Sequence, residues 1–313
     1  MKSIPNTNLL VSNIGLGTAN MGVKLTEKES FDLLDAFLDF GGNLIDTARI
    51  YSDWVPGEIG RSERIIGDWL QNSKKRDNVI LMTKGGHPKF ESMHDSRLSL
   101  QDMRIDIELS LKALRVDVID LYFYHRDDQS QLVEYEIETM ETLRREGKIR
   151  YYGCSNWKVE RILAADAYCK EKGYRGFVAN QALLNLGSKN MKSLNDDTLI
   201  KLDGDLYTYH TKNPQNLAMP YTGIAGGYFH KFIKNGENAV QNSPYHTPEN
   251  IQMVKHCKFL MEKYHATITQ VVLGFFSQQP FQCVPLYGAS SIDDLKNAMD
   301  SMEINFTAKD YIL

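Results

Sequence analysis

The sequence has few cysteines and no long apolar run. Its four cysteines, at positions 154, 169, 257 and 283, lack the close pairs of zinc sites and redox motifs. No window reaches the roughly 18 apolar residues of a membrane span, and no basic run followed by an apolar stretch opens the chain. These absences predict a cytoplasmic protein with reduced thiols, no disulfide framework and no membrane partner.

An excess of basic charge is also missing. The 313 residues include 36 Lys and Arg against 40 Asp and Glu, a net charge of −4 without a clustered basic stripe. This balance argues against nucleic acid as the main partner. With 42% hydrophobic and 24% charged residues the chain is globular rather than disordered. Its length fits either two domains or one large barrel, which needs about 250 residues.

Common nucleotide and metal motifs are absent as well. The segment GLGTANMG (15–22) has two glycines of the G-x-G-x-x-G turn but Met21 at the third position. A Walker A motif and the H-E-x-x-H metal motif do not occur. The sequence therefore predicts neither a Rossmann nucleotide site nor a metal site.

Eight short runs rich in β-branched and apolar residues alternate with segments of helical periodicity, which indicates βα units. The predicted strands are 14–18, 43–47, 79–84, 118–125, 149–155, 177–181, 217–222 and 283–289. Eight such units favour an α/β fold, a (β/α)8 TIM barrel formed by one domain over residues 1–313. A doubly wound open sheet is the alternative.

Helical periodicity is clear at 27–41, 62–71, 100–115, 132–148 and 159–173. In the first of these, Phe31, Leu34, Leu38 and Phe40 define the expected apolar side. Two polar segments interrupt the pattern. One is a surface loop within 185–216 that leads into a helix at 196–210, and the other is 229–250, which precedes helices near 249–264 and 267–278.

Four polar residues stand where apolar strands end. Asp46, Lys84 and His125 close the second, third and fourth predicted strands, and Tyr51 follows Asp46 by five residues. In a barrel these positions converge on the C-terminal rim. An ammonium beside a tyrosine lowers its pKa, so Lys84 is expected to activate Tyr51 while Asp46 holds Lys84. A neutral His125 would orient a substrate carbonyl.

At this point the sequence resembles the aldo-keto reductases. The resemblance is carried by GLGTANMG (15–22), NLIDTARIYS (43–52), RSERIIGDWL (61–70), LMTKGG (81–86), DLYFYHRDD (120–128), GKIRYYGCSNW (147–157), NQ (180–181), PYTGIAGG (220–227) and VPLYGASS (284–291). These segments occur in family order over nearly the whole chain.

The resemblance implies a role for each matching residue. Asp46, Tyr51, Lys84 and His125 match the catalytic tetrad, with Tyr51 as general acid and base. Ser155, Asn156 and Gln181 match the nicotinamide carboxamide site, and Tyr221 matches the stacking aromatic. The implied cofactor site as a whole comprises Gly17, Thr18, Asp46, Ser155, Asn156, Gln181, Tyr221, Thr222, Gly223, Ala225, Gly227, Gly288, Ser290, Ser291, Asp294 and Asn297.

The adenosine end departs from the family pattern. Asp294 stands where NADP-selective members have an arginine for the 2′-phosphate, and a carboxylate there repels a phosphate. The sequence therefore favours NAD(H), with NADP(H) possible if Lys296 swings in. Asn297 and Ala298 replace the Glu-Asn pair that usually contacts adenine.

The substrate side departs too. Ala19 replaces a common aromatic and opens space, while Trp54 and Trp157 are candidate pocket walls beside Tyr51 and His125. Aromatic walls with polar loops suit a sugar, polyol or keto sugar. His87 could face this pocket, but a solvated loop is favoured.

Together these features predict a metal-independent enzyme that interconverts a carbonyl and an alcohol by NAD(P)(H)-linked hydride transfer. Its partner would be a small carbonyl or sugar-like substrate, and the oligomeric state is left open. Two alternatives remain. One is a cofactor-sensing regulatory subunit with little turnover, and the other is a barrel glycosidase using Asp46 and Glu58.

Overall fold

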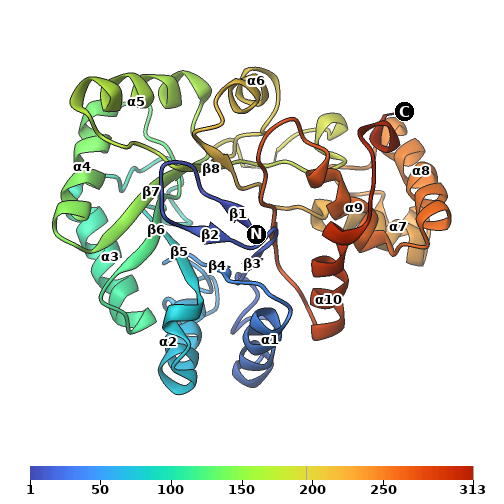
Figure 1. Ribbon diagram of the computed structural model, residues 1–313, viewed down its shortest axis with the longest axis horizontal. Helices are drawn as coiled ribbons and strands as arrows, with labels where there is room; N and C mark the ends of the chain where they lie inside the picture. The colour runs from blue at the N-terminus through green and yellow to red at the C-terminus, as the bar shows by residue number, and fades with distance from the viewer. Residues whose placement is uncertain (195, 313) are drawn as a thin grey trace.

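The computed structural model describes residues 1–194 and 196–312. Its main sheet has eight parallel strands in the order β10-β3-β4-β5-β6-β7-β8-β9. The strands are β3 (Gly15–Gly17), β4 (Leu44–Asp46), β5 (Ile80–Gly85), β6 (Ile119–Tyr124), β7 (Ile149–Ser155), β8 (Ala179–Gln181), β9 (Leu217–Ala218) and β10 (Leu286–Tyr287). Figure 1 shows the strands at the centre and the helices around them.

Backbone hydrogen bonds join the two ends of this sheet. Val284 N–H donates to the carbonyl of Ala218 over 2.9 Å, and Leu286 N–H donates to that of Pro220 over 2.8 Å. The segment leading into β10 thus runs beside β9, and the ring closes. The predicted (β/α)8 fold is confirmed.

Ten α-helices occur in the described residues. They are α1 (Glu27–Asp39), α2 (Arg61–Ser73), α3 (Leu100–Leu114), α4 (Val133–Arg145), α5 (Val159–Lys172), α6 (Gly204–Lys212), α7 (Tyr228–Asn235), α8 (Pro248–Tyr264), α9 (Ile268–Ser277) and α10 (Ile292–Asp300). The first five, α8 and α9 agree with the predicted ranges within a few residues.

The buried face of α1 differs from the predicted one. Leu33, Leu34 and Phe37 are buried, whereas Phe31 and Leu38 only pack against the edge of the core. The expected stripe is therefore shifted around the helix axis. A capping box between Thr26 and Glu29 fixes the first turn.

Two predictions in the polar segments are wrong. The helix expected at 196–210 begins only at Gly204, and the segment expected as an excursion at 229–250 contains α7. Asp203 in extended conformation precedes α6. In α7, Phe229 is buried and Phe232 packs on the core, which explains why this short segment is helical.

A short hairpin closes one end of the barrel. Its strands β1 (Lys2–Ser3) and β2 (Leu10–Val11) lie across the middle of the ring (Figure 1). Ile4, Leu9 and Val11 pack in one cluster with the inward-facing Leu44 and Ile80 near the N-terminal ends of β4 and β5. This seal leaves the C-terminal ends of the strands for a site.

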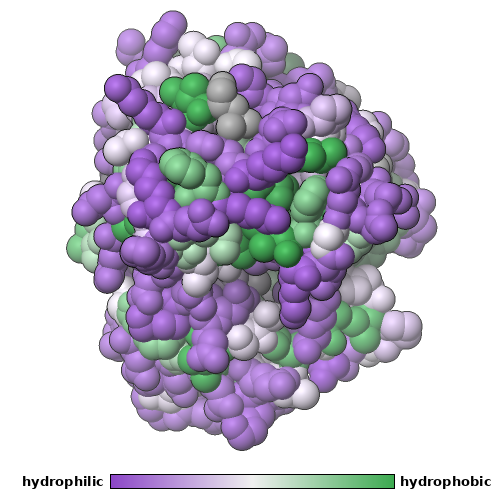
Figure 2. Space-filling view, turned by 90° about the vertical axis from the view of Figure 1, so that its right-hand side faces the viewer, coloured by the Kyte–Doolittle hydropathy of each residue, from purple (hydrophilic) through white to green (hydrophobic). Residues whose placement is uncertain are grey.

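The surface over α7 to α10 is mainly hydrophilic, with small apolar areas between polar groups (Figure 2). Exposed apolar side chains on these helices include Phe259 and Ile292. Scattered apolar side chains are normal on protein surfaces. Within residues 1–194 and 196–312, no helix has both the length and the apolar character that crossing a bilayer requires.

Candidate active site

Strand alternation brings the predicted acid and lysine into the barrel. Leu44 and Met82 belong to the interior apolar cluster, so Asp46 and Lys84, each two residues further on, face the same interior. His125 directly follows β6, the neighbour of β5. All three therefore lie at the end opposite the hairpin, where barrel enzymes carry their sites.

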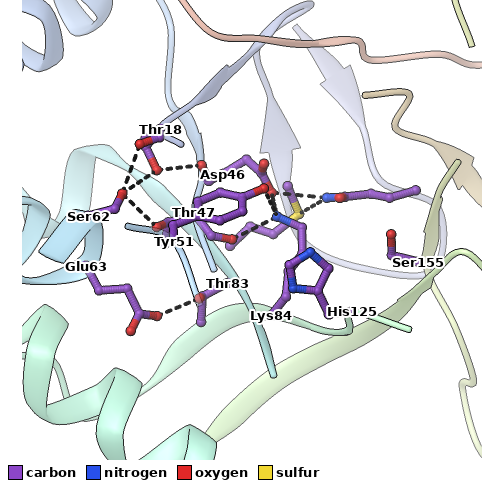
Figure 3. Close-up of polar contacts among 12 residues, drawn as sticks. Thr18, Asp46, Thr47, Tyr51, Ser62, Glu63, Thr83, Lys84, His125 and Ser155 are labelled. Atoms are coloured by element: carbon purple, nitrogen blue, oxygen red, sulfur yellow. Dashed lines mark hydrogen bonds and ion pairs between the residues drawn. The ribbon is translucent and has the colours of Figure 1, made fainter. Parts of the chain in front are cut away.

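Lys84 is the centre of the polar contacts. Its Nζ donates to Asp46 Oδ1 at 2.6 Å, the Thr47 carbonyl at 2.8 Å and Tyr51 Oη at 3.2 Å. An ammonium has three protons, so these three acceptors satisfy it. Figure 3 shows the Lys84 nitrogen between Asp46 and Tyr51, with His125 close by.

The loop that carries Tyr51 is fixed by its backbone. Tyr51 N–H donates to the Ala48 carbonyl and Arg49 N–H donates to the Lys84 carbonyl, each over 3.0 Å. Lys84 Nζ also lies 4.9 Å from the centre of the Tyr51 ring. Tyr51 is thus held over the lysine by main-chain bonds as well as by its hydroxyl.

Burial sets the charges of this group. Lys84 and Asp46 are 2% and 3% exposed. Burial lowers the pKa of Lys84, but the Asp46 charge and the hydrogen bonds to Asp46 and Tyr51 more than offset this, so its net shift is upward. Burial raises the pKa of Asp46 against the opposing charge of Lys84. The lysine therefore stays an ammonium.

The expected lowering of the Tyr51 pKa does not occur. Burial raises the pKa of Tyr51 above its ordinary value, and the nearby Lys84 charge offsets this only in part. Tyr51 consequently holds its proton at neutral pH, as a general acid must before it donates.

His125 is a neutral imidazole. Burial lowers its pKa well below the ordinary value, and the positive charges of Arg126 and Lys84 act in the same direction. Its Nδ1 is buried without a hydrogen-bond partner in the described part of the chain. A neutral ring can orient a carbonyl or hydroxyl without adding charge.

A second buried carboxyl lies on the outer face of β5. Thr83 Oγ1 donates to Glu63 Oε1 of α2 over 2.6 Å, while Oε2 has no partner among the described residues (Figure 3). Burial raises the pKa of Glu63 to about 7, against the opposing hydrogen bond of Thr83. Glu63 therefore takes up a proton on folding between its ordinary pKa of 4.5 and about 7.

Glu63→Gln tests this buried acid. Because the folded state binds the proton more tightly, the Glu63 contribution to unfolding free energy falls as pH rises from about 4.5 to about 7. We expect the variant to match the wild type near pH 5 and to exceed it by about 1–3 kcal/mol at pH 8. Urea unfolding at both pH values measures this, with the exposed Glu91→Gln as control. An equal difference at both pH values would contradict it.

The predicted nicotinamide residues meet beside His125. Asn156 Nδ2 donates to the His125 carbonyl at 3.3 Å and to Ser155 Oγ at 3.1 Å, while its Oδ1 accepts from Tyr221 Oη at 2.5 Å. Gln181 Nε2 donates to Asp46 Oδ1 at 3.1 Å. Amide groups and an aromatic ring therefore lie directly next to the tetrad.

The loop after Tyr221 contains several residues with left-handed backbone. Thr222, Ala225, Gly226 and Gly227 all have left-handed φ angles between 53° and 78°. A side chain at Gly226 would meet open space, so the loop surface there is free. Successive N–H groups in left-handed turns are one type of backbone that forms anion-binding concavities. Gly223 lies within this loop and packs near Phe276.

Lys231 adds a positive charge that sequence reasoning missed. Its Nζ donates to the Gly226 carbonyl over 3.2 Å from the first turn of α7. Lys231 follows Gly227 by four residues, so on a helix the two positions lie on the same face. A helix predicted at this point would therefore have placed Lys231 beside the loop.

The predicted adenosine residues gather where β10 and β3 end. A side chain on Gly17 would lie 3.6 Å from the Gly288 nitrogen, so the two glycines approach closely. Ser291 caps α10, and the Asp294 carboxylate accepts from the Tyr287 hydroxyl and from Ser290 N–H and Oγ at 3.0 and 3.1 Å.

Three other residues, predicted to bind cofactor or next to such residues, make hydrogen bonds or ion pairs with their neighbours in the chain or the barrel. Thr18 is buried and donates to the Asp46 carbonyl at 2.9 Å. Asn297 donates to the Asp293 carbonyl at 2.9 Å, and Lys296 pairs with Asp300. Lys296 is thus engaged away from Asp294.

Aromatic rings surround the tetrad on its open side. Tyr51 lies 6.4 Å from half-exposed Trp54, and Trp54 lies 6.2 Å from Phe90. His87 lies 5.5 Å from Phe90 and 4.7 Å from His125, measured between ring centres. The favoured placement of His87 in a solvated loop is wrong, because it is only 6% exposed. Ala19, which follows Thr18 in the loop after β3, is half-buried.

Trp157 does not lie where the sequence analysis places it. The side chain is fully buried, packs between Tyr124 and Phe177, and donates to the Arg126 carbonyl at 3.3 Å. Its ring fills the core behind the strands, so the expectation of a Trp157 pocket wall is corrected. Phe90 provides aromatic surface instead.

The glycosidase alternative fails on the contacts of its two acids. Asp46 is bound by Lys84 and Gln181, and Glu58 pairs with Arg61 and Arg64. A glycosidase needs one of its two carboxyls protonated and the other free to act on the sugar, whereas both acids here are engaged with cationic side chains.

Comparisons with known proteins agree with this geometry. The sequence model of the Aldo/keto reductase family matches residues 13–312. Relatives include an uncharacterized oxidoreductase, YrpG, of Bacillus subtilis, 28% identical over 96% of this chain and 90% of its own length. An aryl-alcohol dehydrogenase of Pestalotiopsis microspora is 24% identical over 98% of this chain and 78% of its own.

A further relative, the aryl-alcohol dehydrogenase [NADP(+)] of Phanerodontia chrysosporium, is 30% identical over 60% of this chain and 52% of its own. The family match covers almost the entire sequence and coincides with the closed barrel and the residues at its rim. The chain belongs to the aldo/keto reductase family and is an oxidoreductase.

Proposed function

We propose that this chain interconverts a carbonyl and an alcohol by hydride transfer with NAD(H) or NADP(H), in a single barrel domain over 1–313. The observation that carries the proposal is the buried Lys84 ammonium, which contacts both Asp46 and the Tyr51 hydroxyl. Tyr51 is the general acid in reduction and the general base in oxidation.

The tetrad moves one proton at Tyr51 Oη. Burial keeps this proton in place until a developing alkoxide can take it. Lys84, 3.2 Å away, then offsets the phenolate charge, and Asp46 holds the ammonium in position. Neutral His125 orients the substrate oxygen. A bound nicotinamide supplies or accepts the hydride.

The residues on the rim fit such a cofactor. Ser155, Asn156 and Gln181 would hold the carboxamide, and Tyr221 would face the ring. The left-handed turn at 222–227, with Lys231 beside it, would hold the diphosphate. Gly288 to Ser291, with Gly17 next to them, would hold the adenosine end.

We expect NADH to bind more tightly than NADPH. Asp294 is fixed at the start of α10 by Tyr287 and Ser290, and its charge would repel a 2′-phosphate. Aldo/keto reductases use nicotinamide cofactors, and the Phanerodontia relative carries NADP(+) in its name, so a preference for NADH would set this chain apart from that relative. Fluorescence titration with both cofactors measures this preference.

Asp294→Asn should improve NADPH binding several-fold while NADH binding changes little, with Asp293→Asn as the neighbouring control. Tight NADPH binding by the wild type with no preference for NADH would refute the role of Asp294.

The substrate is a small aldehyde, ketone or keto sugar. The rings of Trp54 and Phe90 offer apolar faces to a flat or sugar-like molecule, and two relatives are named aryl-alcohol dehydrogenases. The four buried free cysteines are compatible with a reducing, cytoplasmic location.

A screen of NADH- and NADPH-linked turnover over aldehydes, keto sugars and free sugars tests the function. Turnover of any carbonyl class supports it. Cofactor binding without turnover of any of them would instead favour the regulatory-subunit alternative.

A further inference from the structure

We propose that His87 determines substrate specificity by accepting a hydrogen bond from a substrate hydroxyl on the carbon next to the reacting carbon. The preferred substrates are then α-hydroxy carbonyl compounds and, in the reverse direction, vicinal diols. This inference rests on the proposed function of the tetrad and deepens it.

The tautomer of His87 is fixed by its neighbour. Its Nδ1 lies 2.6 Å from the Pro88 carbonyl oxygen, which can only accept, so Nδ1 carries the proton. The other ring nitrogen, Nε2, is therefore an acceptor. Burial lowers the pKa of His87 to about 4, and Arg126 acts in the same direction. The ring thus stays neutral near pH 7 and keeps this acceptor.

The His87 ring lies next to the ring of His125, with centres 4.7 Å apart. Five rings form a closed circuit of neighbours, with centres 4.7 to 6.4 Å apart: Tyr51, Trp54, Phe90, His87 and His125. Tyr51 and His125 would contact the reacting oxygen. The carbon next to the reacting carbon of the substrate would then face His87, because the His87 ring is the neighbour of the His125 ring.

The surroundings make a hydroxyl the fitting substituent there. Phe90 and Trp54, the next rings in the circuit, offer mainly apolar surface, and His87 is 6% exposed. When an apolar substituent of the substrate displaces water from His87 Nε2, this acceptor is left without a hydrogen bond, which costs free energy. A hydroxyl pairs with it instead, so selection arises from both attraction and rejection.

The test compares substrates that differ by one hydroxyl. Lactaldehyde is paired with propanal, and 2-hydroxyacetophenone with acetophenone, using the full chain and its preferred cofactor. Variants are His87→Leu, which removes the acceptor, and His87→Gln, whose amide oxygen restores one. Each variant is compared with the wild type on the same substrate, so differences in intrinsic carbonyl reactivity cancel.

We expect His87→Leu to lower kcat/KM roughly tenfold or more for the hydroxylated member of a pair and little for the other. His87→Gln should recover part of this selectivity. An equal fall for both members in both variants, or no fall in either, would overturn the role of His87. If the wild type turns over no carbonyl at all, the proposed function fails first and the inference with it.

Discussion

Tyr51→Phe is expected to lower kcat by about three orders of magnitude while leaving the dissociation constant of the cofactor unchanged. The change removes only the hydroxyl that contacts Lys84 and keeps the ring that packs at 6.4 Å from Trp54. Steady-state kinetics and fluorescence titration measure the two quantities. The cofactor residues Ser155, Asn156 and Tyr221 are untouched, so binding should persist.

Two results would speak against this role. Activity close to the wild-type level would mean that another group, or water, provides the proton. A parallel loss of cofactor binding would mean that the variant disturbs the site as a whole. A control variant, Tyr135→Phe, changes a half-exposed hydroxyl that accepts from Leu100 N–H on the outside of the barrel, and should retain full activity.

The buried pair of Asp46 and Lys84 should show strong coupling in stability. Lys84→Met leaves the Asp46 carboxylate with Gln181 as its one side-chain partner among the described residues, and Asp46→Asn leaves the Lys84 ammonium without its ion pair. Each single change is expected to lower the unfolding free energy by about 3 kcal/mol, because an unpaired buried charge remains. The double variant removes both charges. Its loss of unfolding free energy should therefore be clearly smaller than the sum of the losses in the two single variants.

Urea unfolding of the four proteins gives the coupling, expected at about 1–3 kcal/mol. The effects of the same variants on kcat should combine differently from their effects on stability, because Asp46 and Lys84 both act on the one proton transfer at Tyr51. Either single variant should lower kcat about as much as the double variant does. Additive losses in stability would contradict the ion pair, and additive losses in kcat would contradict the common role.

The positions of the strand ends explain why the tetrad could be predicted from sequence. Asp46 and Lys84 end apolar strands, so their location at a rim follows from the sequence. Their inward direction does not, because these strands are buried on both faces and their sequences do not alternate. The sequence also predicted that the charged Lys84 and Asp46 lie near Tyr51. It did not predict the direction of the Tyr51 pKa shift, because the degree of burial is set by loops from several parts of the chain.

Loop residues were the least predictable. Trp157 and His87 both follow strand ends, yet Trp157 turns into the core while His87 turns toward His125. No periodicity governs side-chain direction outside strands and helices. Likewise, Phe229, Phe232 and Ile233 in α7 have helical spacing, but the helix is only eight residues long and ends at Asn235, which is shorter than the window in which such periodicity is recognised.

The most direct test follows deuterium from the cofactor to the product. A reduced cofactor deuterated at both C4 positions is mixed with the wild type and with Tyr51→Phe in single turnovers on a carbonyl substrate. Proton delivery by Tyr51 predicts one deuterium on the carbinol carbon with the wild type, and a rate about three orders of magnitude lower in the variant although cofactor is bound. Deuterium transfer at the same rate in both proteins, or none in the cofactor-loaded wild type, would contradict it.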